Sequence, residues 1–377
     1  MSATASAAPE VASRRLLFIS NGYGEDSVGA EIVRRLPPSL TADAYPTLGP
    51  GNAYAGICPV VGPRAQLVSE GSRVARGTVA RDIATGGLGT LLPGLKFMRS
   101  VRDTYDHVVV IGDFIGVLGC WLAGIRGITY LDVYKTGYGR PYFGLERRII
   151  AKTCRRVFNR SPQLASTLKA IGVDAVAAGN VMMDTVSAGD YAAGLRRSRL
   201  RAVTLLPGSR DQTAENFAIQ AAALRLISED ERPDIFLALA GNIELEELAR
   251  SANLRVDGDR LVGDLTVHAA RGAMRNMVEA SDLVLSQAGT ATIQSLGLGV
   301  PAITFTRRTD RMKRFLEENR LFGGARLLSN DDPADLARAT LKLLRDPAEL
   351  QRLGTIGRER IGGPGVIDKI IAAISAP

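Results

Sequence analysis

The sequence contains few of the residues on which metal, disulfide and histidine chemistry depend. Its 377 residues include two histidines and three cysteines, Cys58, Cys120 and Cys154. The cysteines are odd in number and widely spaced, without a C-x-x-C pair, so neither a zinc site nor a disulfide framework is indicated. We therefore expect no metal site, no cofactor and a reduced, cytoplasmic environment.

Long uncharged apolar runs and the common catalytic fingerprints are also missing. The most apolar stretch, residues 108–125, contains Asp113, and a charge within such a run argues against a membrane-spanning helix. The motifs G-x-x-x-x-G-K-[ST], H-E-x-x-H and G-x-S-x-G do not occur. Any membrane contact is therefore expected to be peripheral.

Positive charge, by contrast, is in excess. Lysine and arginine exceed aspartate and glutamate by eight, and the pI is near 9.6. Such a surplus favours anionic partners, among them nucleotides, nucleic acid and acidic membrane surfaces, unless it only solvates the surface. Of these we expect a nucleotide as partner, and no nucleic acid.

Short apolar runs alternate with helical patterns along the chain, which is typical of parallel sheets covered on both faces. We predict an α/β protein with two doubly wound, Rossmann-like domains and a ligand in the cleft between them. The expected boundaries are a disordered leader (1–14), an N-terminal domain (15–192), a basic linker (193–202) and a C-terminal domain (203–377), whose last helix could pack back on the N-terminal domain. The expected strands lie in RLLFIS, ICPVV, HVVVIGD, GITYLDVY, RRVFNR, RAVTLL, DIFLALA, SDLVLS and VPAITFT.

The first candidate site for a diphosphate follows the strand that ends at Leu206. A turn at Gly208 leads to Ser209, which with Gln212 fits a capping box at the start of a helix. Ser209 by itself is more often only a cap. With Arg210 at the head of the same helix, free amides, the positive helix end and a guanidinium together favour an anion site.

The second candidate is the small-residue loop that follows the strand ending at Ser286. Gly289 permits close backbone approach, and Thr290 and Thr292 add hydroxyl donors beside the free amides of a helical turn. Two such helix starts facing one pocket would hold the diphosphate of a nucleotide. The predicted contact residues of this loop are Gln287, Ala288, Gly289, Thr290, Ala291 and Thr292.

A third glycine-rich loop, in residues 16–36, carries acids where a phosphate would bind. A helix N-terminus favours an anion by roughly 0.3–1 kcal/mol, whereas a carboxylate about 4 Å from a phosphate costs on the order of 4 kcal/mol. We therefore expect this loop to face neutral hydroxyl groups, with Glu25 and Asp26 as acceptors, unless both acids only cap the helix. The loop residues are Asn21, Gly22, Gly24, Glu25 and Asp26.

Asp113 is the candidate general base. It stands where a buried strand gives way to a helix, at the carboxyl edge of the first sheet, where ligands of doubly wound folds bind. A lone aspartate in this position is often only a helix N-cap. Both interpretations stay open at the level of sequence.

Residues 88–103 form a basic and apolar segment. Its apolar residues stand beside three cations, a composition that suits the surface of an anionic bilayer. An ordinary helix with a core-facing side and a charged outer side is the alternative. The residues concerned are Leu91, Leu92, Leu95, Phe97 and Met98, with Lys96, Arg99 and Arg102.

Together these residues resemble the lipid-A-disaccharide synthase family, inverting glycosyltransferases of the two-domain GT-B fold. LLPGSR (205–210) is similar to the family's donor-diphosphate motif and GTAT…LGLGVP (289–301) to its second nucleotide loop. GDF (112–114) stands where the family has Pro-Asp-Phe with its proposed base, and GNVMMD (179–184) resembles the segment that ends the first domain. The opening stretch, with Asp26 followed by Gly29-Ala30, resembles the family's N-terminal glycine-rich loop.

The resemblance implies an acceptor-side N-terminal domain and a C-terminal domain that binds a UDP-sugar. Asp113 would be the base and Arg210 would stabilise the leaving diphosphate. Gln294 stands where the family has a glutamate that grips the ribose, and residues 134–148 have no counterpart, so the chain resembles a divergent relative. The implied reaction transfers a sugar to a hydroxyl, on a lipid or lipid-linked acceptor at the inner membrane surface. A UDP-sugar 2-epimerase-like isomerase and a non-catalytic nucleotide-sugar-binding protein are the alternatives.

Overall fold

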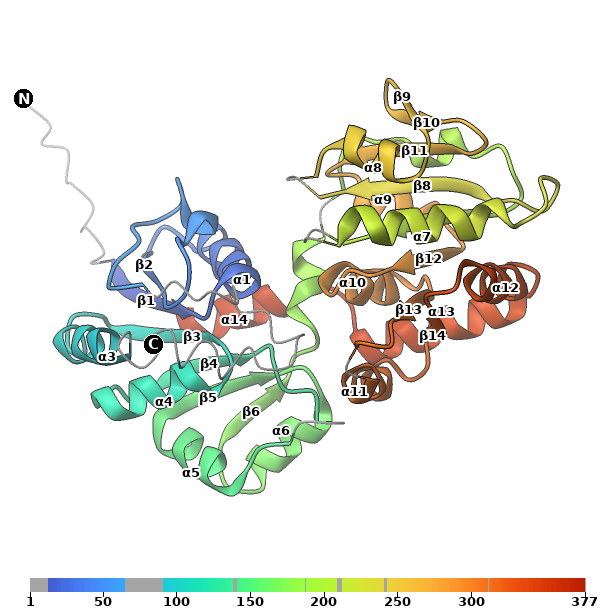
Figure 1. Cartoon of the computed structure of the whole chain (residues 1–377). Coiled ribbons are helices and arrows are strands. Elements are labelled where there is room, and N and C mark those ends of the chain that lie inside the picture. Colours follow the sequence, from blue (N-terminus) through green and yellow to red (C-terminus); the bar gives the residue numbers. More distant parts are fainter. Residues whose placement is uncertain are drawn as a thin grey trace, which may run out of the picture. The chain divides into compact units, whose positions relative to one another are not determined.

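The chain forms two compact units, each built on one sheet (Figure 1). The computed structural model describes residues 13–64, 91–137, 141–186, 188–208, 212–240, 243–310 and 312–376. The first unit comprises Met1–Ala178 with Val366–Pro377, and the second is Gly179–Gly365. Each unit alternates strands with helices, as the sequence predicts for a Rossmann-like fold.

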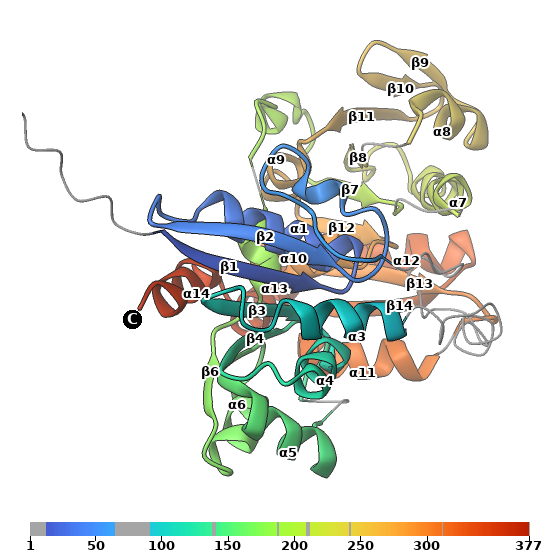
Figure 2. The ribbon, with the colours of Figure 1, turned by 90° about the vertical axis from the view of Figure 1, so that its left-hand side faces the viewer.

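The described part of the first unit contains a parallel six-stranded sheet in the order β2-β1-β3-β4-β5-β6. Figure 2 shows β2, β1 and β3 in this succession. Buried residues such as Leu17, Val110, Tyr130 and Val157 form its core. The elements are β1 (Arg14–Ser20), α1 (Tyr23–Arg34), β2 (Leu40–Pro46), η1 (Asn52–Tyr54), α3 (Leu91–Ser100), β3 (His107–Gly112), α4 (Phe114–Ala123), β4 (Ile128–Asp132), α5 (Gly144–Thr153), β5 (Cys154–Asn159), α6 (Pro162–Lys169), β6 (Asp174–Ala177) and α14 (Val366–Ser375).

The second unit has an eight-stranded sheet within its described residues, in the order β14-β13-β12-β7-β8-β11-β10-β9. Its strands are parallel except at the end formed by the β9–β10 hairpin. The elements are η2 (Val181–Thr185), η3 (Ala193–Arg196), β7 (Ala202–Leu206), α7 (Thr213–Arg225), β8 (Asp234–Leu239), α8 (Leu245–Ser251), β9 (Arg255–Asp257), β10 (Arg260–Val262), β11 (Thr266–Arg271), α9 (Met274–Glu279), β12 (Leu283–Ser286), α10 (Thr290–Leu298), β13 (Ala302–Thr306), α11 (Met312–Phe322), β14 (Arg326–Asn330), α12 (Pro333–Leu344) and α13 (Pro347–Ile361).

The predicted strands coincide with observed ones except for ICPVV. That run contributes only an isolated bridge from Val60 to Ala44, and the second strand is instead LTADAYP, residues 40–46. β2 is an edge strand with one neighbour, so it needs no continuous apolar run to be stable. The apolar pattern therefore identified most central strands, but it missed the interior strand β11, the β9–β10 hairpin and the edge strands β2, β6 and β14.

The boundary between the units differs from the predicted linker. Residues 193–202 belong to the second unit, because Ala193 and Ala202 are buried in one cluster with Phe236 and Arg197 pairs with Asp282. The division falls after Ala178, so GNVMMD opens the second unit instead of ending the first domain.

Both ends of the first unit are held together. Arg14, which was expected in the leader, is the first residue of β1 and donates from its Nη1 atom to the carbonyl of Ile374 in α14. Residues 1–12 of the predicted leader lie outside the described residues. Within the ranges that are described, no helix combines the length and the apolarity needed to cross a bilayer.

Candidate functional site

The first sheet has a topological switch point between β1 and β3. β2 lies on one side of β1 and β3 on the other, so the connections that leave β1 and β3 diverge and open a crevice at the carboxyl edge. Asn21 directly follows β1, and Asp113 directly follows β3. The first switch point therefore places the predicted base beside the glycine-rich loop.

Asp113 is both a helix cap and an oriented carboxylate. Its Oδ1 atom accepts the backbone N–H of Ile115 at 2.9 Å and the side-chain amide of Asn21. Thr47 in turn donates to Oδ1 of Asn21 at 3.1 Å. Gly112 has φ +136°, and a Cβ atom there would lie 3.1 Å from Cβ of Asn21. The two alternatives for Asp113 are thus compatible, because the cap itself fixes the carboxylate.

The acids of the first glycine-rich loop do not lie as predicted. α1 begins at Tyr23 with Gly22 as N-cap, so Gly24, Glu25 and Asp26 are helical residues and not part of an open loop. Asp26 is 3% exposed and accepts a 2.6 Å hydrogen bond from the Ser20 hydroxyl. Burial raises the pKa of Asp26. The prediction that Asp26 receives hydroxyl groups of a ligand is therefore wrong.

A tyrosine completes the network around Asp26. The hydroxyl groups of Tyr54 and Ser20 lie 3.0 Å apart, and Tyr54 is fully buried. A Cβ atom at Gly29 would come within 2.1 Å of the Tyr54 hydroxyl. Gly29 is thus required for packing, which explains a glycine of this motif without any ligand.

The second sheet has its switch point between β7 and β12. The connection that leaves β7 runs to β8 on one side, and the connection that leaves β12 runs to β13 on the other. Ser286 pairs with Leu206, and the N–H of Gln287 donates to the carbonyl of Leu206 at 2.8 Å. Gly208 has φ +105°, and a Cβ atom there would lie 3.8 Å from the carbonyl oxygen of Gln287. The two predicted diphosphate loops therefore leave adjacent strands at one edge.

The helix that follows the first of these loops starts later than predicted. α7 begins at Thr213 with Gln212 as its N-cap, so the predicted capping box is wrong: Gln212 would have to stand at the third helical position. Ser209 and Arg210, the predicted anion contacts, lie outside the described residues. Their roles stay predictions.

The start of α10 is open to solvent. Gly289 is the N-cap, and no side chain accepts a capping hydrogen bond from the amides of the first helical turn. Gly289 and Thr290 are exposed and Ala291 is partly exposed. A helix N-terminus of this kind favours an anion.

Thr292 differs from the prediction. It is 2% exposed, and its hydroxyl lies 2.7 Å from that of Ser286 and donates to the carbonyl of Ala288. The N–H of Ala288 also donates to the Ser286 hydroxyl at 3.2 Å. Thr292 and Ala288 thus shape the loop from within, and Gly289, Thr290 and Ala291 are the residues that a ligand can reach.

The two glutamines of this region are mainly internal. Gln294 is 7% exposed, and its amide donates to the carbonyl of Met182 at 2.9 Å and to the Thr185 hydroxyl at 3.1 Å. A ribose contact from Gln294 would therefore have to use its Oε1 atom. Gln287 donates to the carbonyl of Phe305 at 3.0 Å, while its Oε1 atom is buried without a partner among the described residues.

Arg307 is a candidate that the sequence reasoning missed. It directly follows β13, the strand beside β12, and its side chain is 12% exposed. The guanidinium donates to Oδ1 of Asn216 at 2.7 Å and lies 3.5 Å from Glu215, both on the first turns of α7. The rule that drew attention to Asp113, a charged residue just beyond a buried strand, would have found Arg307 too.

The described part of the predicted membrane segment packs one side on the first unit and leaves its charged side exposed. Its described part forms α3 and a following turn, in which Met98 is buried, Leu95 and Phe97 pack on the core, and the Phe97 ring lies 4.8 Å from that of Tyr45. Leu92 remains 72% exposed. The side chain of Leu91 and residues 88–90 lie outside the described residues. For Leu95, Phe97 and Met98 the core-facing alternative is the correct one.

Comparisons with known proteins reveal similarity in structure only. No family model matches the chain, and no curated protein matches it in sequence. The spinosyn rhamnosyltransferase SpnG complexed with thymidine diphosphate is 14% identical, with a TM-score of 0.64 over 96% of this chain and 100% of its own. MurG of Acinetobacter baumannii is 15% identical, with a TM-score of 0.60 over 96% and 99%.

A UDP-N-acetylglucosamine 2-epimerase is similar to the same degree. It is 16% identical, with a TM-score of 0.57 over 95% of both chains. At these identities the likeness concerns the fold. The chain has the predicted α/β fold of GT-B type, with two Rossmann-like units, which its neighbours use for sugar transfer and for epimerisation alike.

Proposed function

We propose that the protein transfers a sugar from a UDP-sugar to a hydroxyl acceptor, with inversion and without a metal. The observation that carries the proposal is the edge of the second sheet at β7 and β12. Two small-residue segments leave adjacent strands there, next to an uncapped helix start and to Arg307. Such an edge suits a diphosphate.

In the proposed reaction the second unit holds the donor. Amides of Gly289 to Ala291 and of the Gly208–Ser209 turn, together with Arg210, would bind the diphosphate oxygens and stabilise the charge that develops on departure. Oε1 of Gln294 is the atom available for the ribose. Arg307 adds positive charge at the same edge.

The first unit would supply the acceptor and the base. The acceptor hydroxyl gives its proton to Asp113 while its oxygen forms a bond to the anomeric carbon. The bond from that carbon to the diphosphate oxygen breaks, and UDP leaves with the bonding electron pair. Asn21 keeps the Asp113 carboxylate in one orientation throughout. The reaction requires the carboxyl edges of both sheets to face one bound donor.

We also propose that the acceptor is a lipid or a lipid-linked sugar at the inner membrane surface, as in a divergent relative of the lipid-A-disaccharide synthases. The net charge of +8 and exposed apolar residues of the first unit such as Leu92 support a site at an anionic membrane.

A 2-epimerase-like isomerisation is the second candidate, and the likeness to a UDP-N-acetylglucosamine 2-epimerase favours it. An isomerase consumes its UDP-sugar without an acceptor. A nucleotide-sugar-binding protein without chemistry would bind the donor and convert nothing.

One experiment separates the three. The protein is incubated with labelled UDP-sugars, with and without a total lipid extract, and labelled lipid, free UDP and epimerised donor are measured. Label that enters lipid only when the extract is present supports the transferase. An altered donor in the absence of extract supports the isomerase, and bound but unchanged donor supports the binding protein.

A further inference from the structure

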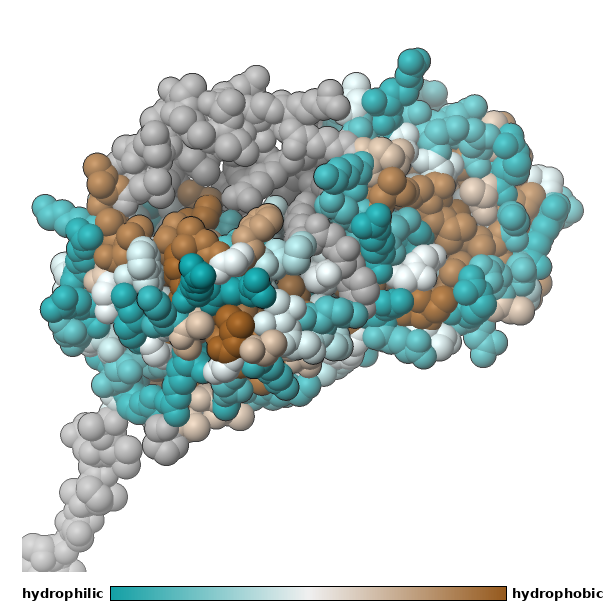
Figure 3. Space-filling model, turned by 90° about the horizontal axis from the view of Figure 1, so that it is seen from below, coloured by the Kyte–Doolittle hydropathy of each residue, from teal (hydrophilic) through white to brown (hydrophobic). Residues whose placement is uncertain are grey.

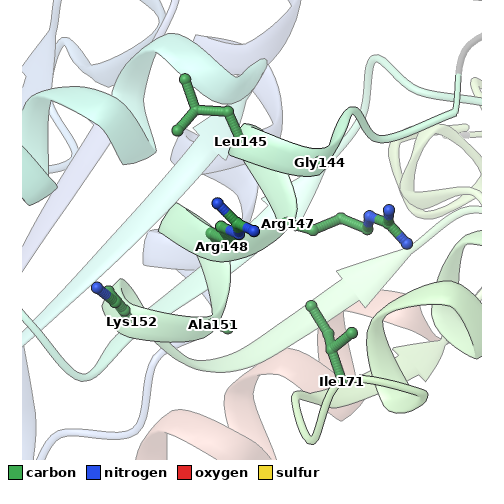
Figure 4. A pocket seen from close by; sticks show the side chains of 7 residues that line it. All are labelled: Gly144, Leu145, Arg147, Arg148, Ala151, Lys152 and Ile171. Atoms are coloured by element: carbon green, nitrogen blue, oxygen red, sulfur yellow. The ribbon is translucent and has the colours of Figure 1, made fainter.

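One side of α5 carries a basic and apolar surface that the proposed reaction does not use. Ile149 and Ile150 are buried on the inner side of this helix. The outer side borders a shallow depression lined by Leu145, Arg147, Arg148, Lys152 and, from the turn after α6, Ile171 (Figure 4). We refer to these five residues as the α5 face.

The apolar residues of this region are unusually exposed for their size. Leu145 is 69% exposed and Ile171 41%, and Phe143, directly before α5, is 68% exposed. Scattered single apolar residues are normal on a protein surface, but neighbouring ones mark an interaction site. Figure 3 shows apolar patches bordered by hydrophilic residues on this side of the molecule.

The charge of the α5 face has one sign. Among the described residues no carboxylate pairs with Arg147, Arg148 or Lys152. Glu146 is the acid of α5, but its side chain is 16% exposed and pairs with Lys135 at 2.8 Å. The face therefore presents three cations around exposed leucine and isoleucine side chains.

Exposed apolar side chains continue beyond α5. α5 packs on α4 and α4 packs on α3. α4 exposes Ile115 (51%) and Leu122 (45%), and α3 exposes Leu92 (72%). Apolar exposure spread over three neighbouring helices suits an extended, flat partner better than a small ligand.

We propose that the α5 face docks on the surface of an anionic phospholipid membrane. The three cations would lie among the lipid phosphates, and Leu145 and Phe143 would enter the boundary between head groups and acyl chains. A long arginine or lysine side chain reaches the charged layer while its stem covers apolar surface. The inference rests on the proposed function only in that a lipid acceptor gives the docking its purpose.

The test measures binding to vesicles without donor or acceptor. Vesicles of phosphatidylglycerol and phosphatidylcholine are compared with pure phosphatidylcholine vesicles in a sedimentation assay at low salt. Wild-type protein is expected to bind only the anionic vesicles, and more weakly as salt rises. The combined change Arg147→Gln, Arg148→Gln and Lys152→Gln is expected to weaken binding at least about tenfold, since each basic residue near the surface contributes.

Two further variants distinguish the α5 face from general charge effects. The matched control changes three exposed cations of the second unit, Arg250, Arg255 and Lys313, to glutamine, and it should bind like the wild type. Leu145→Ser should weaken binding even at moderate salt, because its contribution is not ionic. Circular dichroism and urea unfolding verify that the variants remain folded.

Several results would overturn the proposal. They are wild-type protein that stays in solution at low salt, an α5 triple variant that binds like the wild type, and equal loss of binding in the control. Preferential binding to duplex DNA over anionic vesicles at the same salt would reveal a general polyanion surface instead. If the protein binds vesicles here but transfers no sugar in the experiment with labelled UDP-sugars and lipid extract, the proposed function is refuted and the docking stands.

Discussion

The carboxyl edges of the two sheets differ in charge and in how much of their hydrogen bonding is already used. The first edge carries Asp113 and the buried Asp26, each bound to side chains of its own unit. The second edge offers glycine and threonine at an uncapped helix start, with Arg307 nearby. Two units of the same Rossmann-like type thus suit opposite tasks, an alcohol with its proton at one edge and a phosphate at the other.

The largest expected effect comes from removing the base at the first edge. Asp113→Asn keeps the N-cap acceptor and the size of the side chain but cannot take a proton at neutral pH. We expect the transfer rate to fall by about 10²–10⁴-fold, with UDP-sugar affinity nearly unchanged because the donor loops lie in the second unit. Steady-state rates and calorimetric donor titration measure the two quantities, and a variant that keeps its rate would show that Asp113 is only a helix cap.

The next effect comes from making the second edge as acidic as the first. Thr290→Glu introduces a carboxylate at the exposed start of α10, where repulsion of a bound diphosphate should cost about 2 kcal/mol, or roughly a thirtyfold loss of UDP affinity. Thr290→Gln is the matched control and should bind UDP almost normally. Equal affinities of the two variants would mean that the diphosphate binds elsewhere.

A third change tests the packing that keeps the first edge in shape. Gly29→Ala forces a methyl group against the buried Tyr54 hydroxyl, so we expect the free energy of unfolding to fall by about 1–3 kcal/mol. Gly24→Ala, in the same helix but with open space around the added carbon, should instead stabilise by up to about 1 kcal/mol. Urea unfolding of both variants measures the contrast, and equal effects would contradict the packing explanation.

Much of this contrast could be predicted from the sequence, because strand ends and glycine loops fix where the chain turns at a parallel sheet. The adjacency of the loops at Gly208 and Gly289 follows from β7 pairing with β12. The local pattern cannot show, however, which side chain fills which space. Asp26 looked available because it lies in a glycine-rich segment, yet it is buried against Ser20, whose hydroxyl also lies beside that of Tyr54, distant in sequence.

Edge elements and charged core residues escaped prediction for a related reason. The sequence of β2 is polar because only part of this strand is buried. Residues 193–202 resemble a linker because they are rich in arginine, but Arg197 and Arg201 pair with Asp282, which is distant in sequence. Phe97 and Met98 suited either a membrane surface or a core-facing helix, and they pack on the core. In each case a long-range contact overrides the local composition.

The smallest expected effect concerns the buried acid of the first edge. Burial raises the pKa of Asp26 in the folded protein, so the folded state holds this proton more tightly than the unfolded chain does. The stability that the proton provides is present below the ordinary carboxyl pKa of about 3.8 and is lost as pH rises through the raised value. Asp26→Asn can still accept a hydrogen bond from Ser20. We therefore expect this change to raise the free energy of unfolding more at pH 7 than near pH 3. Urea unfolding across this range measures the difference, with Asp103→Asn, at an 83% exposed side chain, as control. A gain in stability that does not depend on pH would mean that the ionised carboxylate of Asp26 does not destabilise the fold.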